Sequence, residues 1–471
     1  MLFNSTQFLL FFPVVCLLYY CIPARHRRSR NVLLLVASYY FYMSWEPTYV
    51  LLLLTSTFTT YIAALGIEHS RTKRAKKDWL FASILSNLCI LFLFKYFNFI
   101  GSNINDIFRA SGLALTIPRF DLLLPVGISF YTFQALGYSI DVYRGTTKAE
   151  HDFLTYALFV SFFPQLVAGP IERSNHLLPQ FKQQHYFDYI QAMTGLKYMV
   201  WGYFLKLVLA DRCAIYVDAV FNNVSHHNGS SFALASLLFT FQIYGDFAGY
   251  SMIAIGTARL LGFRLMNNFR CPYFSCSVGE FWHRWHISLS TWFKDYVYIP
   301  LGGNRVGKAR NYTNLLITFL LSGIWHGANW TFIFWGALHG VLLCIEKFFG
   351  IQHQYIGFRK IVHCGATFVI LCITWMIFRA NSLADIMTIC TRTIDVWGTP
   401  FVQDVGWGVL LTSFMAIAMV IGKELTEEYC WSTVNRLKAT PLFQYVGIAS
   451  LLAVISLFGV FGDNQFIYFQ F

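Results

Sequence analysis

The chain has 471 residues, of which 56% are hydrophobic and only 12% are charged. Apolar runs of about 20 residues, the length needed to cross a bilayer, recur from end to end, which excludes an ordinary soluble protein. The formal net charge is +12, but the Lys and Arg residues lie in short loops between apolar runs, so they indicate positive-inside membrane orientation rather than nucleic-acid binding.

The first predicted membrane spans lie on either side of basic loops. Residues 6–22 are apolar, and four arginines at 25–30 follow them, which predicts a cytoplasmic loop and an outside N-terminus. The basic loop at 71–77 is also predicted to be cytoplasmic, so two spans must lie between the loops, with a break at Pro47. Residues 79–100 then cross outward again.

The next predicted spans are interrupted by helix-breaking residues. Residues 122–143 contain a proline and two glycines, and residues 152–169 contain Pro164. Broken helices of this kind are tolerated where they line a protein cavity rather than lipid. Residues 188–210 and 231–261 form further apolar spans.

Two regions that follow have unusual polarity. The span 231–261 contains Gln242, Tyr244 and Asp246, which predict either hydrogen bonds between helices or the lining of a cavity. Residues 263–305 place aromatic side chains on one helical face and polar side chains beside it. This pattern predicts an amphipathic helix, interfacial or re-entrant, that ends at a proline and two glycines.

Residues 313–350 are flanked by basic residues on both sides, so they must enter the membrane and return, with a turn near Gly327. This turn places His326 deep in the membrane.

The remaining predicted spans are 361–380, 406–422 and 441–460. The sequence thus predicts an all-α polytopic protein with roughly eleven spans plus re-entrant or interfacial helices. It predicts a single membrane domain over 1–471 with both termini outside.

Two histidine patches indicate buried acid–base chemistry. His326 lies in an otherwise apolar segment, where an ionisable residue suggests a functional site, and His286 lies in an earlier aromatic patch. A neutral imidazole takes a proton from an attacking hydroxyl group. Trp325 and Asn329 are candidate donors to the resulting oxyanion, and Ser290 shares a helical strip with His286. The alternative for His326 is a structural histidine at a helix kink.

A metal site is not predicted. The spacing of His283 and His286 suits a metal, but no carboxylate or Cys joins them at ligand spacing, and the chain has no His-Glu-x-x-His motif. The 11 Cys residues lie mostly in apolar runs. They are predicted to behave as small hydrophobic side chains.

Five motifs along the chain are specific in combination: LPVGISFYTFQ at 124–134, FPQLVAGPI at 163–171, RWHISLS at 284–290, WFKDY at 292–296 and GIWHG at 323–327. Through them the chain resembles the membrane-bound O-acyltransferase family, in the branch of alginate O-acetyltransferases. The resemblance covers nearly the whole chain. It implies a ring of helices around thinned membrane, with a central funnel that joins the two sides.

The resemblance also implies a reaction. His326 matches the near-invariant catalytic histidine of the family, and His286 matches its second active-site histidine. The branch implies acetyl-CoA as a cytoplasmic donor substrate, with no bound cofactor, and an alginate-like exported polysaccharide as the acceptor. It further implies a bacterial cytoplasmic (inner) membrane, surrounding lipid, and SGNH-hydrolase-like partner proteins in the periplasm or outside the cell.

Two further predictions concern donor binding and transfer. Arg305, Lys308 and Arg310 are candidates for the phosphates of acetyl-CoA, because they are basic and on the predicted cytoplasmic side. Positive-inside bias explains the same three residues. Tyr468 lies in a terminal aromatic motif that resembles one in this branch and suggests an acyl relay. The alternative for Tyr468 is an aromatic anchor at the membrane interface.

Other functions fit parts of the pattern. The sequence does not distinguish acetylation of alginate from acetylation of cellulose or peptidoglycan. A lipid acyltransferase would share both histidines but use a hydrophobic acceptor. A transporter would also contain broken helices and buried polar residues, but it would move a solute without consuming a thioester.

Overall fold

The structure is a computed structural model that describes residues 1–120, 125–167, 169–351, 355–403, 405–429, 440–462 and 467. These residues form helices joined by turns and loops, and no strand occurs among them. The predicted all-α class is therefore confirmed for the described part of the chain.

The backbone groups into two compact units. Unit 1 comprises Met1–Leu196 and Ala254–Met266, and unit 2 comprises Lys197–Ile253 and Asn267–Phe471. Two of the boundaries fall inside helices, α10 (Tyr189–Tyr203) and α12 (Gly229–Leu260). That residues 1–471 form a single domain stays a prediction.

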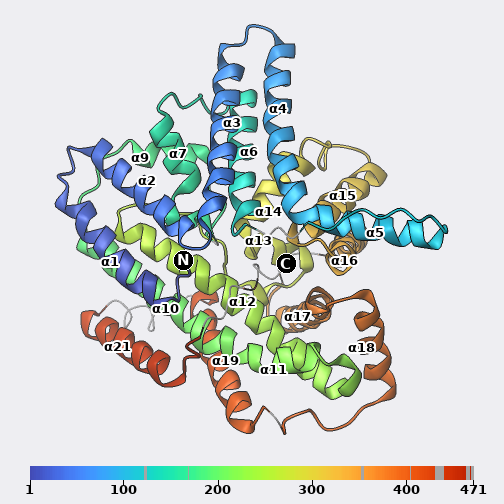
Figure 1. Cartoon of the computed structure of the whole chain (residues 1–471). Helices are drawn as coiled ribbons and strands as arrows, with labels where there is room; N and C mark the ends of the chain where they lie inside the picture. Colours follow the sequence, from blue (N-terminus) through green and yellow to red (C-terminus); the bar gives the residue numbers. More distant parts are fainter. Residues whose placement is uncertain are drawn as a thin grey trace. The chain divides into compact units, whose positions relative to one another are not determined.

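Unit 1 contains the helices of the first part of the chain. They are α1 (Thr6–Cys21), α2 (Arg27–Met43), α3 (Val50–His69), α4 (Lys73–Leu91), α5 (Phe97–Ala110), α6 (Ile128–Arg144), α7 (Phe153–Ser161), α8 (Phe163–Leu166) and α9 (Ser174–Phe181). Most predicted breaks are present: Pro47 lies between α2 and α3, and Gly127 precedes α6. The chain also bends at Phe162, just before Pro164, whereas α6 runs unbroken through Gly137. Helices α3, α4 and α6 lie side by side (Figure 1).

Hydroxyl and amide groups join these apolar helices. Ser56 of α3 donates to the Asn87 side chain of α4 over 2.5 Å, and Ser83 of α4 donates to Ser139 of α6 over 2.9 Å. Thr60 donates to the Ser56 carbonyl of its own helix over 2.6 Å. Such bonds satisfy polar groups where water is absent and align neighbouring membrane helices.

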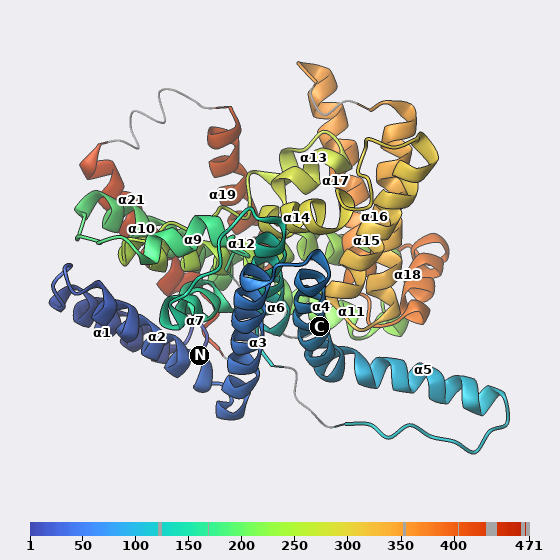
Figure 2. The ribbon, with the colours of Figure 1, turned by 90° about the horizontal axis from the view of Figure 1, so that it is seen from above.

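The helix after α4 differs from the prediction. A π-helical turn, Phe92–Tyr96, bends the chain, and α5 then runs away from the end of α4 (Figure 2). The sequence predicts a span that ends at residue 100, followed by an external segment, 101–121, with an interfacial piece. The structure continues as helix to Ala110, because the segment between these points is amphipathic rather than irregular.

Unit 2 contains most of the remaining helices. They are the π-helix η3 (Phe204–Ala210), α11 (Asp211–Phe221), α13 (Val278–Arg284), α14 (Ile287–Phe293), α15 (Lys308–His326), α16 (Trp330–Phe349), α17 (Phe358–Arg379), α18 (Leu383–Asp395), α19 (Trp407–Glu428) and α21 (Pro441–Phe458). Helices α15 and α16 form the predicted hairpin with a turn after His326 (Figure 1).

One continuous amphipathic helix within residues 263–305 is a wrong prediction. The structure has two short helices, α13 and α14, separated at Trp285 and His286. Helical periodicity did not reveal the break, because His286 adopts a left-handed backbone conformation that the aromatic pattern does not signal. Helices α11 and α18 were also not predicted.

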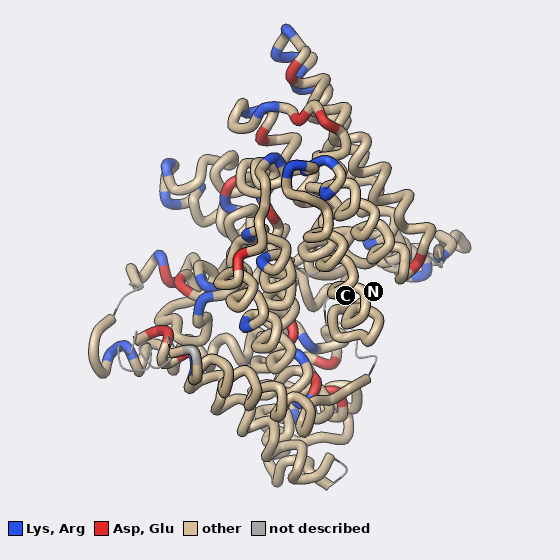
Figure 3. Tube along the Cα trace, turned by 90° about the vertical axis from the view of Figure 1, so that its left-hand side faces the viewer, with Lys and Arg blue, Asp and Glu red and all other residues tan. Residues whose placement is uncertain are grey.

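Six helices are long and apolar enough to cross a membrane. They are Pro47–His69, Lys73–Ala110, Gly229–Leu260, Trp330–Phe349, Phe358–Arg379 and Trp407–Glu428, with shorter apolar helices at Thr6–Cys21 and Leu442–Phe458. Long helical stretches carry neither sign of charge, and many charged residues lie at helix ends and turns (Figure 3). The protein is therefore a multi-pass membrane protein.

Candidate active site

His326 ends α15 at the tip of the α15–α16 hairpin. It is 3% exposed, and its Nδ1 lies 2.6 Å from the carbonyl oxygen of Ser322. Because a carbonyl oxygen only accepts hydrogen bonds, Nδ1 carries a proton in this contact. In the neutral ring, Nε2 then bears the lone pair, which is the tautomer that a general base requires.

Close packing of α15 and α16 at two glycines fixes the position of His326 along the helix pair. A Cβ atom added to Gly323 would lie 2.3 Å from the carbonyl oxygen of Phe332, and one added to Gly336 would lie 2.4 Å from that of Phe319. The backbones of α15 and α16 therefore touch, as glycine permits in membrane helix pairs. His326 follows Gly323 by less than one turn, so the backbone contact sets its position.

His286 lies at the break between α13 and α14. It is fully buried, with φ 43° and ψ 53°. Asn268 holds this turn, because its carbonyl accepts from the Ile287 N–H over 2.9 Å and its side-chain oxygen accepts from the Ser288 hydroxyl over 2.6 Å. A left-handed conformation at a non-glycine residue costs about 1–3 kcal/mol, and such residues gather at active sites.

Aromatic rings connect three histidines of unit 2. The ring centroids of His286 and Trp325 are 6.0 Å apart, and those of Trp325 and His326 are 4.9 Å apart. On the other side, Trp335 lies 5.0 Å from His326 and 4.8 Å from His339. The structure thus brings the two predicted histidines and Trp325 together, and it adds His339 to the cluster.

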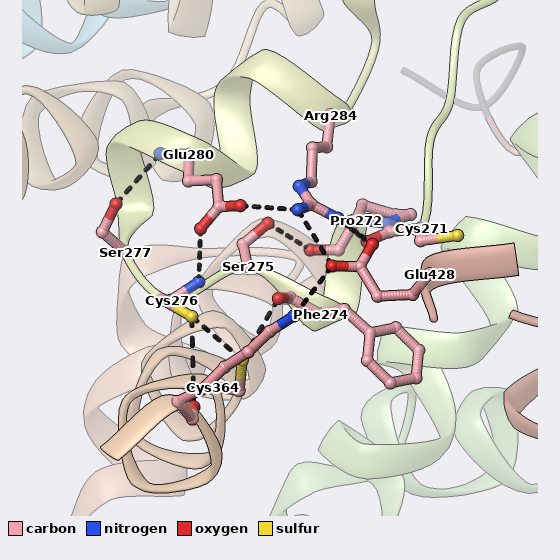
Figure 4. Close-up of polar contacts among 11 residues, drawn as sticks. Cys271, Pro272, Phe274, Ser275, Cys276, Ser277, Glu280, Arg284, Cys364 and Glu428 are labelled. Atoms are coloured by element: carbon pink, nitrogen blue, oxygen red, sulfur yellow. Dashed lines mark hydrogen bonds and ion pairs between the residues drawn. The ribbon is translucent and has the colours of Figure 1, made fainter. Parts of the chain in front are cut away.

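An ion-pair network holds the helix that precedes His286 (Figure 4). Arg284 lies 2.6 Å from the Glu280 carboxylate and 2.7 Å from that of Glu428, and Lys360 lies 3.1 Å from Glu428. Burial would lower the pKa of Arg284, but the two carboxylates outweigh burial and raise this pKa. The end of α13 is therefore fixed by charge, two residues before the left-handed turn.

A cavity of about 720 Å³ lies next to the histidine cluster and is separated from the rings of His326 and His339 by residues bonded to them. Its lining includes Ser322, whose carbonyl accepts from His326, and Trp282, whose indole N–H donates to His339 over 3.3 Å. The walls of the cavity come from α13, α14, α15 and α16. The volume suits a small-molecule substrate, since ligand pockets commonly span about 300–1,000 Å³.

Cationic and polar side chains also line this cavity. They include Lys294, Lys347, His283 and the predicted residue Ser290. The Ser290 hydroxyl donates to the Trp285 carbonyl over 3.2 Å. The sequence did not single out the two lysines as donor ligands. Lys294 shares the helical strip of the histidines, which was a usable signal, whereas Lys347 had only its charge.

Asn329 has a structural position in the hairpin turn. Its side-chain oxygen accepts from the Thr331 N–H over 3.1 Å and caps the N-terminus of α16. Its amide nitrogen donates to the Asn381 carbonyl over 2.9 Å. Both polar ends of the side chain thus stabilise the turn after His326, and donation to an oxyanion stays a prediction.

Of the predicted site residues with described positions, only Ser290 lines the cavity, and the predicted cations lie apart from it. Arg305, Lys308 and Arg310 are exposed, and the cavity is lined by their neighbour Asn304 instead. Tyr468 lies outside the described residues, so the relay stays a prediction. Among the residues that the structure describes, no three His, Cys, Asp or Glu side chains are grouped to hold a metal ion.

Known proteins resemble this chain over most of its length. The model of the membrane-bound O-acyltransferase family matches residues 148–384. A probable alginate O-acetylase AlgI of Pseudomonas syringae is 44% identical over 387 residues, which cover 81% of this chain and 73% of the relative. The AlgI protein of Azotobacter vinelandii is 39% identical over 470 residues, which cover 99% and 86%.

A third relative has another acceptor in its name. The peptidoglycan O-acetyltransferase of Helicobacter pylori is 34% identical over 429 residues, which cover 84% of this chain and 80% of the relative. The matched region contains both His286 and His326 of the buried cluster. The chain therefore belongs to the membrane-bound O-acyltransferase family and is an O-acyltransferase.

Proposed function

We propose that this enzyme transfers acetyl groups from cytoplasmic acetyl-CoA to an exported, alginate-like polysaccharide. The observation that carries the proposal is the position of His326, whose turn borders a cavity lined by lysines. Lysines suit the phosphates of coenzyme A, and the histidine suits the acyl group. Relatives named alginate O-acetylase, at 39–44% identity, favour alginate as the acceptor.

In this proposal His326 is the general base. Its Nε2 takes the proton of the acceptor hydroxyl as the hydroxyl oxygen bonds to the acetyl carbonyl carbon. The thioester C–S bond then breaks, and the coenzyme A sulfur leaves and takes the proton back from His326. His286 positions or polarises the acyl group, and buried N–H donors stabilise the oxyanion that forms between these steps.

The proposal includes the predicted membrane arrangement. Roughly eleven spans would surround a central funnel, with both termini outside the inner membrane. Acetyl-CoA would enter from the cytoplasm, and SGNH-hydrolase-like partner proteins would receive acetyl groups outside. Peptidoglycan is a second candidate acceptor, because the Helicobacter pylori relative is a peptidoglycan O-acetyltransferase.

Sealed membrane vesicles test the donor and its side together. Acetyl-CoA does not cross membranes, so label from its acetyl group is expected to reach an acceptor only in inside-out vesicles. The measurement is ester-bound label on polysaccharide trapped in the vesicle lumen of inside-out vesicles or added outside right-side-out vesicles, or on membrane protein in both orientations. Equal labelling of right-side-out vesicles would contradict the cytoplasmic donor site.

Binding of acetyl-CoA by the cavity lysines can be distinguished from binding by the three cations predicted from the sequence. Lys294→Gln with Lys347→Gln is expected to raise the KM for acetyl-CoA by roughly 10- to 100-fold with little change in kcat, because a hydrogen bond to a charged group is lost without altering His326. The matched control replaces Arg305, Lys308 and Arg310 with Gln. A larger KM change in the control would favour the sequence-based candidates over the cavity lysines.

A further inference from the structure

A buried charge cluster lies in unit 2 apart from the histidines. Lys206, Asp211 and Asp246 are each less than 5% exposed. The Lys206 ammonium lies 2.8 Å from an Asp211 oxygen and 2.7 Å from an Asp246 oxygen. With both carboxylates ionised, the cluster carries one excess negative charge. Burying that charge is costly unless further donors reach it.

The local backbone explains how the charges meet. Lys206 lies in the π-helix η3, where the Asp211 N–H bonds to the Lys206 carbonyl five residues earlier. Cβ atoms added to Gly202 or Gly249 would lie within 2.8 Å of the other glycine's carbonyl oxygen. The backbones before η3 and along α12 therefore touch, which brings Lys206 to Asp246.

The C-terminal segment supplies donors at this place. The backbone N–H of Ile467 donates to the second Asp246 oxygen over 2.6 Å, and Ile467 is 4% exposed. Seven residues earlier, the Val460 N–H donates to the Leu207 carbonyl of η3 over 2.9 Å. Val460 and Ile467 are thus both bonded to unit 2, and the bond of Ile467 is charge-assisted.

This attachment lies next to the active-site wall. Asp246 precedes Phe247 on α12, and the Phe247 ring centroid lies 4.5 Å from that of His286. We propose that the Lys206–Asp211–Asp246 cluster anchors Ile467 to α12 one residue before Phe247, whose ring packs on His286, and that Asp246 is a positioning residue for acyl transfer. The positioning role rests on the proposed function, whereas the anchor itself does not.

The backbone donor allows a sharp test. Ile467→Pro removes the N–H and leaves the charge cluster intact, whereas its matched control Ile467→Ala keeps the N–H. Asp246→Asn removes the charge at nearly constant shape, and Asp218→Asn changes an exposed carboxylate of α11 in the same way. Each variant is prepared as the full chain in lipid nanodiscs.

Chymotrypsin cleavage after Phe461 reports the anchor. Phe461 is exposed and follows Val460, whose N–H is bonded to the Leu207 carbonyl, so release of the Ile467 contact is expected to raise the rate of cleavage there. Intact-mass spectrometry is expected to show roughly tenfold faster cleavage in Ile467→Pro and Asp246→Asn than in their controls. Unchanged cleavage in both variants would overturn the anchor, whatever the enzyme acetylates.

Acetylation reports the positioning role separately. Ile467→Pro and Asp246→Asn are expected to lower kcat for polymer acetylation at least tenfold while the KM for acetyl-CoA stays within about twofold. Faster cleavage with unchanged kcat would overturn the positioning role. A failure of the proposed function would appear instead as an active His326→Ala variant, with the cleavage difference still present.

Discussion

His326→Ala is expected to lower acetyl transfer by about 10²–10⁴-fold, the usual contribution of general acid–base catalysis. The Nδ1 contact with the Ser322 carbonyl fixes the tautomer in which Nε2 accepts a proton, and alanine removes that acceptor. The measurement is ester-bound acetyl on the polymer, compared at equal enzyme level in the membrane. The KM for acetyl-CoA is expected to change little, because the cavity lysines are untouched.

A matched control distinguishes chemistry from folding. His226→Ala makes the same substitution at an exposed histidine and is expected to keep wild-type acetylation. The thermal midpoint of His326→Ala is measured in parallel, since a buried ring also contributes packing. A folded His326→Ala protein with wild-type acetylation would rule out the general-base role.

His286 is expected to separate a chemical from a conformational requirement. His286→Asn keeps a residue that tolerates the left-handed backbone, so the protein is expected to fold while acetylation falls about 100-fold or more. His286→Val places a β-branched residue at the same φ of 43° and is expected to lose about 1–3 kcal/mol of stability as well. Thermal unfolding and acetylation assays measure the two effects.

Cys271 provides the conformational control for His286. It is the other non-glycine residue with positive φ among those described, also at 43°. Cys271→Asn is expected to keep both fold and acetylation, because the change is compatible with the backbone and lies outside the ring cluster. Wild-type activity in His286→Asn would show that His286 serves the turn and not the reaction.

Much of the fold follows from apolar runs and basic loops. The α15–α16 hairpin and the breaks at Pro47 and near Pro164 were predicted, because hydrophobic length and helix-breaking residues are local signals. The break at His286 was not, because it depends on Asn268, which holds the turn from outside the local pattern. A tertiary contact of this kind leaves no periodic trace in the sequence.

The sequence predicted the histidine cluster of the site but not the cations that line the cavity. His326, His286 and Trp325 stand out because polar or bulky groups in apolar segments are rare, and the structure places their rings in one cluster. The cavity lysines were missed, since basic residues near a membrane also arise from orientation. Their distinction from Arg305, Lys308 and Arg310 depends on which side chains border the space, which only the folded chain defines.

Buried polar groups that bond within their own helix and those that pair with another helix have different consequences for biosynthesis. Thr60 bonds to a carbonyl of its own helix, so α3 carries this hydroxyl into lipid without needing another helix. Lys206 and Asp246 pair across η3 and α12, while Lys206 also pairs with Asp211, and an unpaired charge at a helix centre costs about 2.5–3.5 kcal/mol on insertion. We therefore expect the contact between η3 and α12 to form early in membrane assembly, because it gives the Asp246 charge its partner.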